Sequence, residues 1–90
     1  MPRKKRIIAP RILYVLEENK KVGMIFSDIF RAMARHDWFH NQNTISSNLK
    51  YLMKENKIVW INKIYSIIQV RENGTKFAVI IDPVEKTVEI

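Results

Sequence analysis

The chain has 90 residues, no cysteine, and sixteen basic against nine acidic side chains, a formal charge of +7. This length holds one domain with one modest hydrophobic core. Without cysteine, disulfides, cysteine-based zinc sites and iron–sulfur clusters are excluded. The apolar runs are far shorter than the roughly 20 residues that a membrane span needs, so no transmembrane segment is predicted.

The positive charge is concentrated near the start of the sequence. Four basic residues stand within the first six: Arg3, Lys4, Lys5 and Arg6. Residues 82–90 carry a net −2, so residues 1–81 hold +9. Such a surplus attracts polyanions, of which nucleic acid is the commonest and an anionic membrane the next. We expect residues 1–7 to form a flexible basic arm, or a merely solubilising tail, and residues 8–90 to form one domain.

The basic start does not continue into a secretory signal. The apolar segment that follows is interrupted by Pro10 and Arg11, so a signal of this kind is not predicted. The missing signal leads us to expect a cytoplasmic protein. The basic surplus leads us to expect that it is associated with the nucleoid.

Apolar residues at helical spacing predict two helices in the first half of the chain. The first spans Ala9–Glu18 and tolerates Pro10 in its first turn, where no amide donor is needed. After a short extended piece at Met24–Phe26, the second begins with Ser27 as its N-cap and ends near Arg35. Its predicted buried side chains are Ile29, Phe30 and Met33.

An aromatic, polar loop is predicted at residues 36–42. Trp38 and Phe39 are expected to fix it by packing between the second and third helices. His36 and His40 stand four residues apart, a spacing that on a helix can begin a metal site. Because no third ligand is in view, we expect no metal.

The third helix is predicted from about Asn43 to about Asn56. Asn56 is expected to end it, because Asn tolerates the left-handed conformation that follows a helix. Its buried stripe comprises Ile45, Leu49, Leu52 and Met53. The opposite side, called here the outer face, comprises Asn43, Ser47, Lys50, Tyr51 and Lys54. This outer face contains no acidic residue.

From Ile58 onward the apolar period changes to two, which predicts antiparallel strands. Asn73–Gly74 is the strongest hairpin signal and predicts a type I′ turn. Pairing outward from it places Glu72 opposite Thr75, Arg71 opposite Lys76, Val70 opposite Phe77, Ile68 opposite Val79 and Ser66 opposite Ile81. A second turn is predicted at Asn62–Lys63, pairing Trp60 with Tyr65. A third at Pro83–Glu85 returns Lys86–Ile90 as an edge strand.

The order of elements is that of an α+β, winged helix-turn-helix domain: three helices followed by an antiparallel β-hairpin or meander. The segment Thr44–Val59 resembles the recognition-helix stretch of bacterial, archaeal and archaeal-viral winged-helix regulators. The matching positions are Thr44, Ile45, Ser46, Leu49, Leu52, Ile58 and Val59. The chain departs from the pattern where Asn56–Lys57 replaces a glycine and in its long aromatic loop. The resemblance covers residues 8–82 and indicates a superfamily, not a target.

The resemblance implies a transcriptional regulator that binds specific double-stranded DNA with its third helix in the major groove. Base contacts are predicted for Asn43, Ser47 and Lys50, phosphate contacts for Thr44 and Ser46, and backbone contacts for Tyr51 and Lys54. A solvated polar face is the alternative, and the missing acids favour DNA. The basic arm would lie in the minor groove or along phosphates.

The hairpin supplies the wing in one of two ways. If strands Ile58–Ile61 and Ile64–Val70 meet directly, Lys63 is the tip. If the first strand continues through a bulge, Arg71 and Lys76 form the tip instead. We favour the first.

Other functions receive less support from the residues. No nucleophile, carboxylate pair or phosphate-binding loop is evident, so we expect no enzyme, cofactor or small-molecule ligand. Two rivals remain. One is a protein interaction module whose edge strand Thr87–Ile90 is extended by a partner or by a second copy of itself. The other is an RNA or single-strand binder that stacks bases on Trp60 and Tyr65. A homodimer is expected for a DNA-binding protein of this size, but the sequence does not locate its surface.

Overall fold

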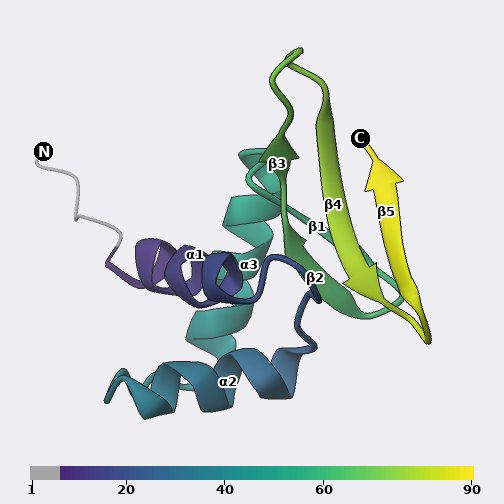
Figure 1. Ribbon diagram of the computed structural model, residues 1–90. Coiled ribbons are helices and arrows are strands. Elements are labelled where there is room, and N and C mark those ends of the chain that lie inside the picture. The colour runs from purple at the N-terminus through teal and green to yellow at the C-terminus, as the bar shows by residue number, and fades with distance from the viewer. Residues whose placement is uncertain (1–6) are drawn as a thin grey trace, which may run out of the picture.

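The structure is a computed structural model that describes residues 7–90, with three helices followed by antiparallel strands in an α+β arrangement (Figure 1). The helices are α1 (Ile8–Glu18), α2 (Phe26–Arg35) and α3 (Gln42–Lys54). The strands are β1 (Ile58–Ile61), β2 (Ile64–Ile67), β3 (Gln69–Val70), β4 (Lys76–Ile81) and β5 (Glu85–Glu89). Within residues 7–90, no helix has the length and apolar character that crossing a bilayer requires.

The core lies among the three helices, with α1 in contact with both α2 and α3. The predicted stripe of α3 is confirmed at Ile45, Leu49 and Leu52, which are buried, whereas Met53 is half-buried against the core. In α2, Ile29 and Met33 are fully buried as predicted. Phe30 is exposed instead and Ala32 takes the buried position, so the prediction for Phe30 was wrong.

The start of α2 differs from the prediction. Ile25, not Ser27, is the N-cap, and no side chain caps the helix. The reason lies in the preceding extended segment, where Met24 exchanges backbone hydrogen bonds of 2.8 and 2.7 Å with Tyr65. This pairing ends the extended segment early, and the carbonyl of Ile25 then accepts the amide hydrogens of Asp28 and Ile29.

The ends of α3 are set by two asparagines. The side chain of Asn41 accepts the amide hydrogen of Thr44 at 2.8 Å, so the helix begins at Gln42, one residue before the predicted start. At the other end Asn56 has φ +58°, the left-handed conformation expected there.

The first hairpin confirms the prediction. β1 and β2 pair antiparallel with Trp60 opposite Tyr65. Asn62 and Lys63 have φ values of +51° and +66°, as a two-residue type I′ turn requires.

The second hairpin has a register one residue away from the predicted one. Gln69 faces Phe77 and Val70 faces Lys76, so the predicted pairs of Val70 with Phe77 and Arg71 with Lys76 were wrong. The loop has three residues, because the amide of Gly74 donates to the carbonyl of Arg71 at 2.9 Å. Of loop residues 72–74 only Gly74, at φ +87°, is left-handed. This geometry is a type I turn followed by a bulge, not a type I′ turn.

The side chain of Asn73 accounts for that choice. Its Oδ1 accepts hydrogen bonds from the amide of Thr75 at 3.0 Å and from the Thr75 hydroxyl at 2.7 Å. These bonds satisfy Asn73 without a left-handed backbone. The carbonyl of Thr75 accepts the amide hydrogen of Arg71 at 2.8 Å, so Thr75 lies opposite Arg71 and the predicted pair of Glu72 with Thr75 was wrong.

The strands form two sheets, β1–β2 and β3–β4–β5, in place of one long hairpin. The chain changes partners at Ile68, whose amide donates to the carbonyl of Lys57 at 3.0 Å, so Ile68 does not pair with Val79. Ser66 does not pair with Ile81 either. Its buried hydroxyl donates to the carbonyl of Val79 at 2.7 Å and thereby joins the two sheets.

The third predicted turn is confirmed, and β5 returns along β4 as the edge strand of its sheet. The Asp82–Pro83 peptide bond within this turn is cis. Figure 1 shows the β3–β4 loop projecting at the end of the molecule where α3 terminates, far from the β1–β2 and β4–β5 turns.

Candidate nucleic-acid interface

The outer face of α3 is open to solvent along most of its length. Asn43, Ser47, Lys50 and Lys54 are all exposed. No acidic residue occurs within Gln42–Lys54, and Glu55 follows only as the C-cap. A helix with this surface can enter the major groove of DNA without placing a carboxylate against phosphate.

Local hydrogen bonds restrict some of these groups. The hydroxyl of Ser47 donates to the carbonyl of Asn43 at 2.9 Å, which leaves its lone pairs as acceptors for a ligand. The amide of Thr44 is already bonded to Asn41. Thr44 and Ser46 are half-buried, so a phosphate contact from Thr44 would use its hydroxyl and not its amide.

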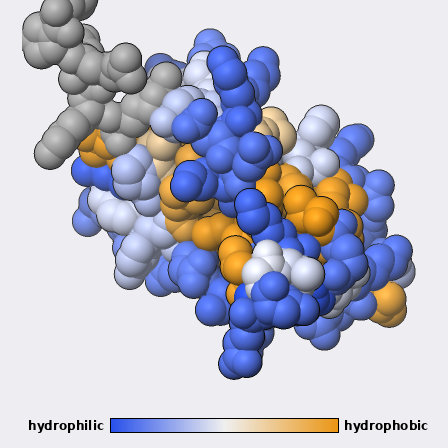
Figure 2. Space-filling model, turned by 90° about the horizontal axis from the view of Figure 1, so that it is seen from above, coloured by the Kyte–Doolittle hydropathy of each residue, from blue (hydrophilic) through white to orange (hydrophobic). Residues whose placement is uncertain are grey.

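Tyr51 differs from the other outer-face residues. It is half-buried and packs against the hydrophobic core. Together with Ala9, Pro10 and Leu13 it lines a cleft of about 180 Å³ between α1 and α3. The helical angle alone placed Tyr51 on the outer face, whereas its ring leans toward α1. Figure 2 shows apolar side chains gathered in the middle of the face seen from above and surrounded by hydrophilic ones.

The β1–β2 turn presents an exposed lysine beside an aromatic groove. Lys63 lines this groove of about 380 Å³ together with Trp60, Tyr65 and the first residues of α2. The rings of Trp60 and Tyr65 are stacked with centroids 5.9 Å apart, and Trp60 remains 54 % exposed. Burial raises the pKa of the Tyr65 hydroxyl, so this group stays protonated at neutral pH.

One carboxylate lies near this turn. The side-chain amide of Asn62 donates to Asp82 Oδ2 at 2.8 Å, which connects the β1–β2 turn with the β4–β5 turn. Asp82 thus places a carboxylate beside the turn that carries Lys63.

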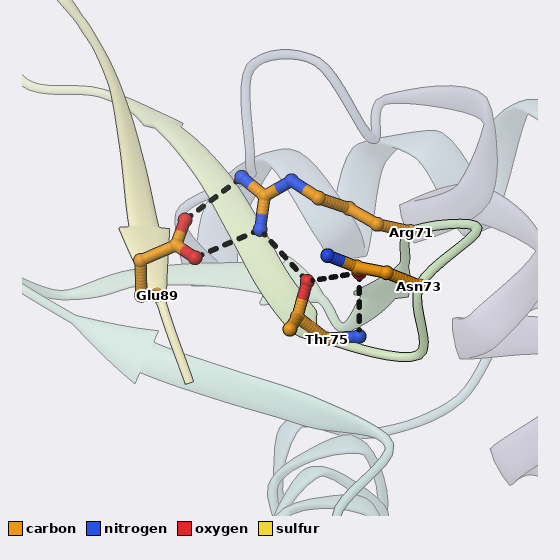
Figure 3. Close-up of polar contacts among 4 residues, drawn as sticks. All are labelled: Arg71, Asn73, Thr75 and Glu89. Atoms are coloured by element: carbon orange, nitrogen blue, oxygen red, sulfur yellow. Dashed lines mark hydrogen bonds and ion pairs between the residues drawn. The ribbon is translucent and has the colours of Figure 1, made fainter.

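The other two predicted wing cations flank the β3–β4 loop, and one of them is bound by a carboxylate. Arg71 donates two hydrogen bonds of 2.8 Å to the carboxylate of Glu89 on β5 (Figure 3). Its guanidinium also lies 4.3 Å from the centroid of the Phe77 ring. Hydrogen bonding between the two side chains lowers the pKa of Glu89 and raises that of Arg71. Lys76 is exposed.

The two histidines of the aromatic loop have different neighbours. His36 Nε2 lies 3.2 Å from Glu18, whereas His40 Nε2 lies 3.2 Å from Arg11. The two imidazoles therefore face different partners, and within residues 7–90 no cluster of three metal-ligating side chains occurs. Trp38 stacks on His36 with centroids 4.7 Å apart. Phe39 is 72 % exposed, so its predicted packing between the helices was wrong.

Residues 1–6 of the predicted basic arm lie outside the described residues, and Ile7 is the N-cap of α1. Arg3, Lys4, Lys5 and Arg6 carry +4, which leaves twelve basic and nine acidic side chains, a net of +3, in residues 7–90. More than half of the net charge therefore belongs to the first six residues.

The chain was also compared with known proteins. No protein-family model, curated protein or solved structure matched it. The candidate interface is therefore defined by its own residues: the exposed outer face of α3 and the lysine at the β1–β2 turn. Sequence reasoning missed Asn41, which caps α3, and Glu89, which engages Arg71. An Asn three residues before Thr44 was a usable signal for the cap, but nothing local signalled Glu89.

Proposed function

We propose that the chain is a winged-helix protein that binds specific sequences of double-stranded DNA, as a transcriptional regulator does, with α3 in the major groove. The observation that carries the proposal is the exposed, acid-free outer face of α3. Asn43, Ser47 and Lys50 have the donors and acceptors that contact base edges, and Lys54 can reach phosphate.

The connection between the helices and the first hairpin supports a winged arrangement. The extended residue Met24 between α1 and α2 pairs with Tyr65 in β2, and β2 pairs in turn with β1. This pairing holds the β1–β2 turn against the start of α2, where both line one groove. Lys63 at this turn is then the tip of the wing, and Arg71 with Lys76 is not.

The charge distribution assigns the arm a large share of the electrostatic attraction. The four basic residues within the first six carry more net charge than the remaining 84 residues together. If all four contact phosphates, they alone steepen the salt dependence of log K by about 3 to 4.

The experiment is a binding titration on duplexes selected from a random pool, by fluorescence anisotropy at several salt concentrations. Lys50→Ala and Asn43→Ala should each lower the affinity for the selected duplex by about 1 to 3 kcal/mol. Lys76→Ala is the matched control: like Lys50→Ala it removes one positive charge, but from the start of β4. It is expected to leave affinity nearly unchanged. Salt-independent binding, or equal losses for Lys50 and Lys76, would contradict the proposal.

A second candidate function rests on Trp60. Its half-exposed ring, stacked on Tyr65 and bordered by Lys63, is a surface on which an unpaired base can stack. Competition between duplex and single-stranded oligonucleotides separates the two functions. Preference for single strands, lost in Trp60→Ala, would favour this second function over duplex binding.

A further inference from the structure

The outer edge of β5 carries unpaired backbone groups. Along the β4–β5 ladder, the amide of Ile90 donates to Lys76 and the amide of Asp82 donates to Val84. Because hydrogen-bonded positions alternate in an antiparallel pair, the even-numbered residues of β5 point their N–H and C=O groups toward β4. Those of Glu85, Thr87 and Glu89 therefore point outward, where no other strand of residues 7–90 is paired with them.

This edge lacks the features that usually prevent strand addition. The register is continuous over all five residues, from Glu85 opposite Ile81 to Glu89 opposite Phe77, so no bulge bends the strand away. No proline lies within Glu85–Glu89. Its protection consists of charged side chains, and a regular, unpaired edge of this kind is a template for another strand.

We propose that β5 pairs antiparallel with β5 of a second copy of this chain, with Thr87 opposite Thr87, so that two three-stranded sheets join into one. Such a contact is its own complement, because each copy offers the same row of donors and acceptors to the other. Thr87 exchanges both of its outward hydrogen bonds with its counterpart at the two-fold axis.

The side chains agree with this register at three pairs of positions. Val84 and Ile90, which are 63 % and 55 % exposed, lie opposite one another at each end of the contact and would cover each other. Thr87 meets its counterpart at the centre, a favourable cross-strand pair. Lys86 stands opposite Val88, so its aliphatic stem can lie along the valine.

The remaining pair brings Glu85 opposite Glu89, which by itself would be repulsive. Arg71 removes this obstacle. Its guanidinium holds Glu89 through two hydrogen bonds of 2.8 Å and lies on the same side of the sheet (Figure 3). Glu85 of the second copy then meets a neutralised pair that includes a cation, and Arg71 also fixes the end of β5 against β4.

This inference does not depend on the proposed function, because strand pairing requires no DNA. Sedimentation equilibrium without nucleic acid therefore tests it separately. The unchanged chain should show twice the monomer mass as its concentration rises. A monomer at every concentration would overturn the proposal and would leave the DNA-binding proposal standing.

Two substitutions at the centre make the test specific. Thr87→Pro removes an outward N–H and no bond to β4, so it should yield a folded monomer wherever the unchanged chain is dimeric. Thr87→Val keeps the N–H and should remain dimeric. Circular dichroism checks that each variant folds. Dimerisation by a folded Thr87→Pro variant would overturn the proposal.

A cross-link gives an answer that does not depend on proline. The chain has no cysteine, so Thr87→Cys introduces one thiol per copy. Residues directly opposite at a hydrogen-bonded antiparallel position have Cα atoms about 5.5 Å apart, within the range that a disulfide bridges. Thr87→Cys should form a covalent dimer under mild oxidation, and Lys21→Cys on the exposed α1–α2 connection should not. Equal cross-linking of both variants, or none at Thr87→Cys, would contradict the pairing.

Discussion

The two hairpins of this protein have similar ingredients and different surroundings. Each has a turn containing asparagine and a cation near its tip, Lys63 in the first and Arg71 in the second. Lys63 is exposed beside the start of α2. Arg71 is bound by Glu89 and lies over Phe77, both within its own sheet.

The difference shows that β5, through Glu89, determines whether the cation of the second hairpin is available to a ligand. Without Glu89, the guanidinium of Arg71 would lack its carboxylate partner and would be available to a phosphate. With Glu89 present, Arg71 instead binds the edge strand β5. A basic residue near a hairpin tip therefore predicts a nucleic-acid contact only after its own neighbours are known.

The largest expected effect lies where the two hairpins meet. Gly23 has φ +75°, and a Cβ there would lie 2.5 Å from Cγ2 of Ile64 in β2 and 3.5 Å from Cγ2 of Ile80 in β4. Gly23→Ala adds backbone strain to this overlap, and we expect it to lower the free energy of unfolding by about 2 to 5 kcal/mol. Urea denaturation measures the change.

Gly74→Ala is the control from the tip of the second hairpin. Its φ of +87° is similar, but nothing lies within 4 Å of the added Cβ, so the expected loss is only the strain, about 1 to 2 kcal/mol. Equal losses for Gly23→Ala and Gly74→Ala would show that the hairpins do not meet closely at Gly23.

A smaller effect is expected at the hydrogen bond between the sheets. Ser66→Ala leaves the carbonyl of Val79 without the bond of 2.7 Å that its hydroxyl now supplies. We expect a loss of about 1 to 3 kcal/mol in unfolding free energy, because the partner stays buried. Ser47→Ala, which removes an exposed hydroxyl from α3, should change stability by no more than about 0.5 kcal/mol. A neutral Ser66→Ala would mean that this hydrogen bond does not contribute to holding the two sheets together.

The same contrast explains how far the sequence predicts the fold. Helical periodicity located all three helices, and Asn62–Lys63 located the first turn, because each signal is local. The register of the second hairpin was missed because Asn-Gly permits loops of two or three residues. The choice between the two loop lengths depends on the hydrogen bonds that Thr75 donates to Asn73, and on the distant hydrogen bond that Ser66 donates to Val79.

The candidate site also has features that the local sequence predicts and features that depend on distant contacts. The exposure of Asn43, Ser47, Lys50 and Lys54 follows from their angular positions around one helix, so it could be predicted. The partial burial of Tyr51 depends on how α1 crosses α3, and the engagement of Arg71 depends on a carboxylate 18 residues later. Neither could be derived from local pattern.

Substitutions in the two hairpins should have different, though modest, effects on DNA binding. If the β1–β2 turn is the wing, Lys63→Ala should weaken binding similarly for all sequences and reduce the slope of log K against log salt by about 1. Arg71→Ala, which also removes one cation, should leave that slope unchanged because Arg71 is occupied by Glu89. Anisotropy titrations over a range of salt measure both slopes. The reverse result would assign the wing to the second hairpin.

The smallest effect concerns the titration of Glu89. Hydrogen bonding to Arg71 lowers the pKa of this carboxyl in the folded chain, so between the lowered and the ordinary value the unfolded chain binds more protons. The pair therefore contributes its full stabilisation above the ordinary pKa of a glutamate, and the contribution is lost as pH falls through the lowered one. Arg71→Gln should raise the pKa of Glu89 toward its ordinary value and flatten the dependence of stability on acidic pH. A carbon-detected NMR titration of the carboxyl measures the shift, with Lys76→Gln as a control that removes a cation not bonded to Glu89. If both variants shifted the pKa of Glu89 equally, the overall positive charge of the second hairpin, and not the Arg71 contact, would be what lowers this pKa.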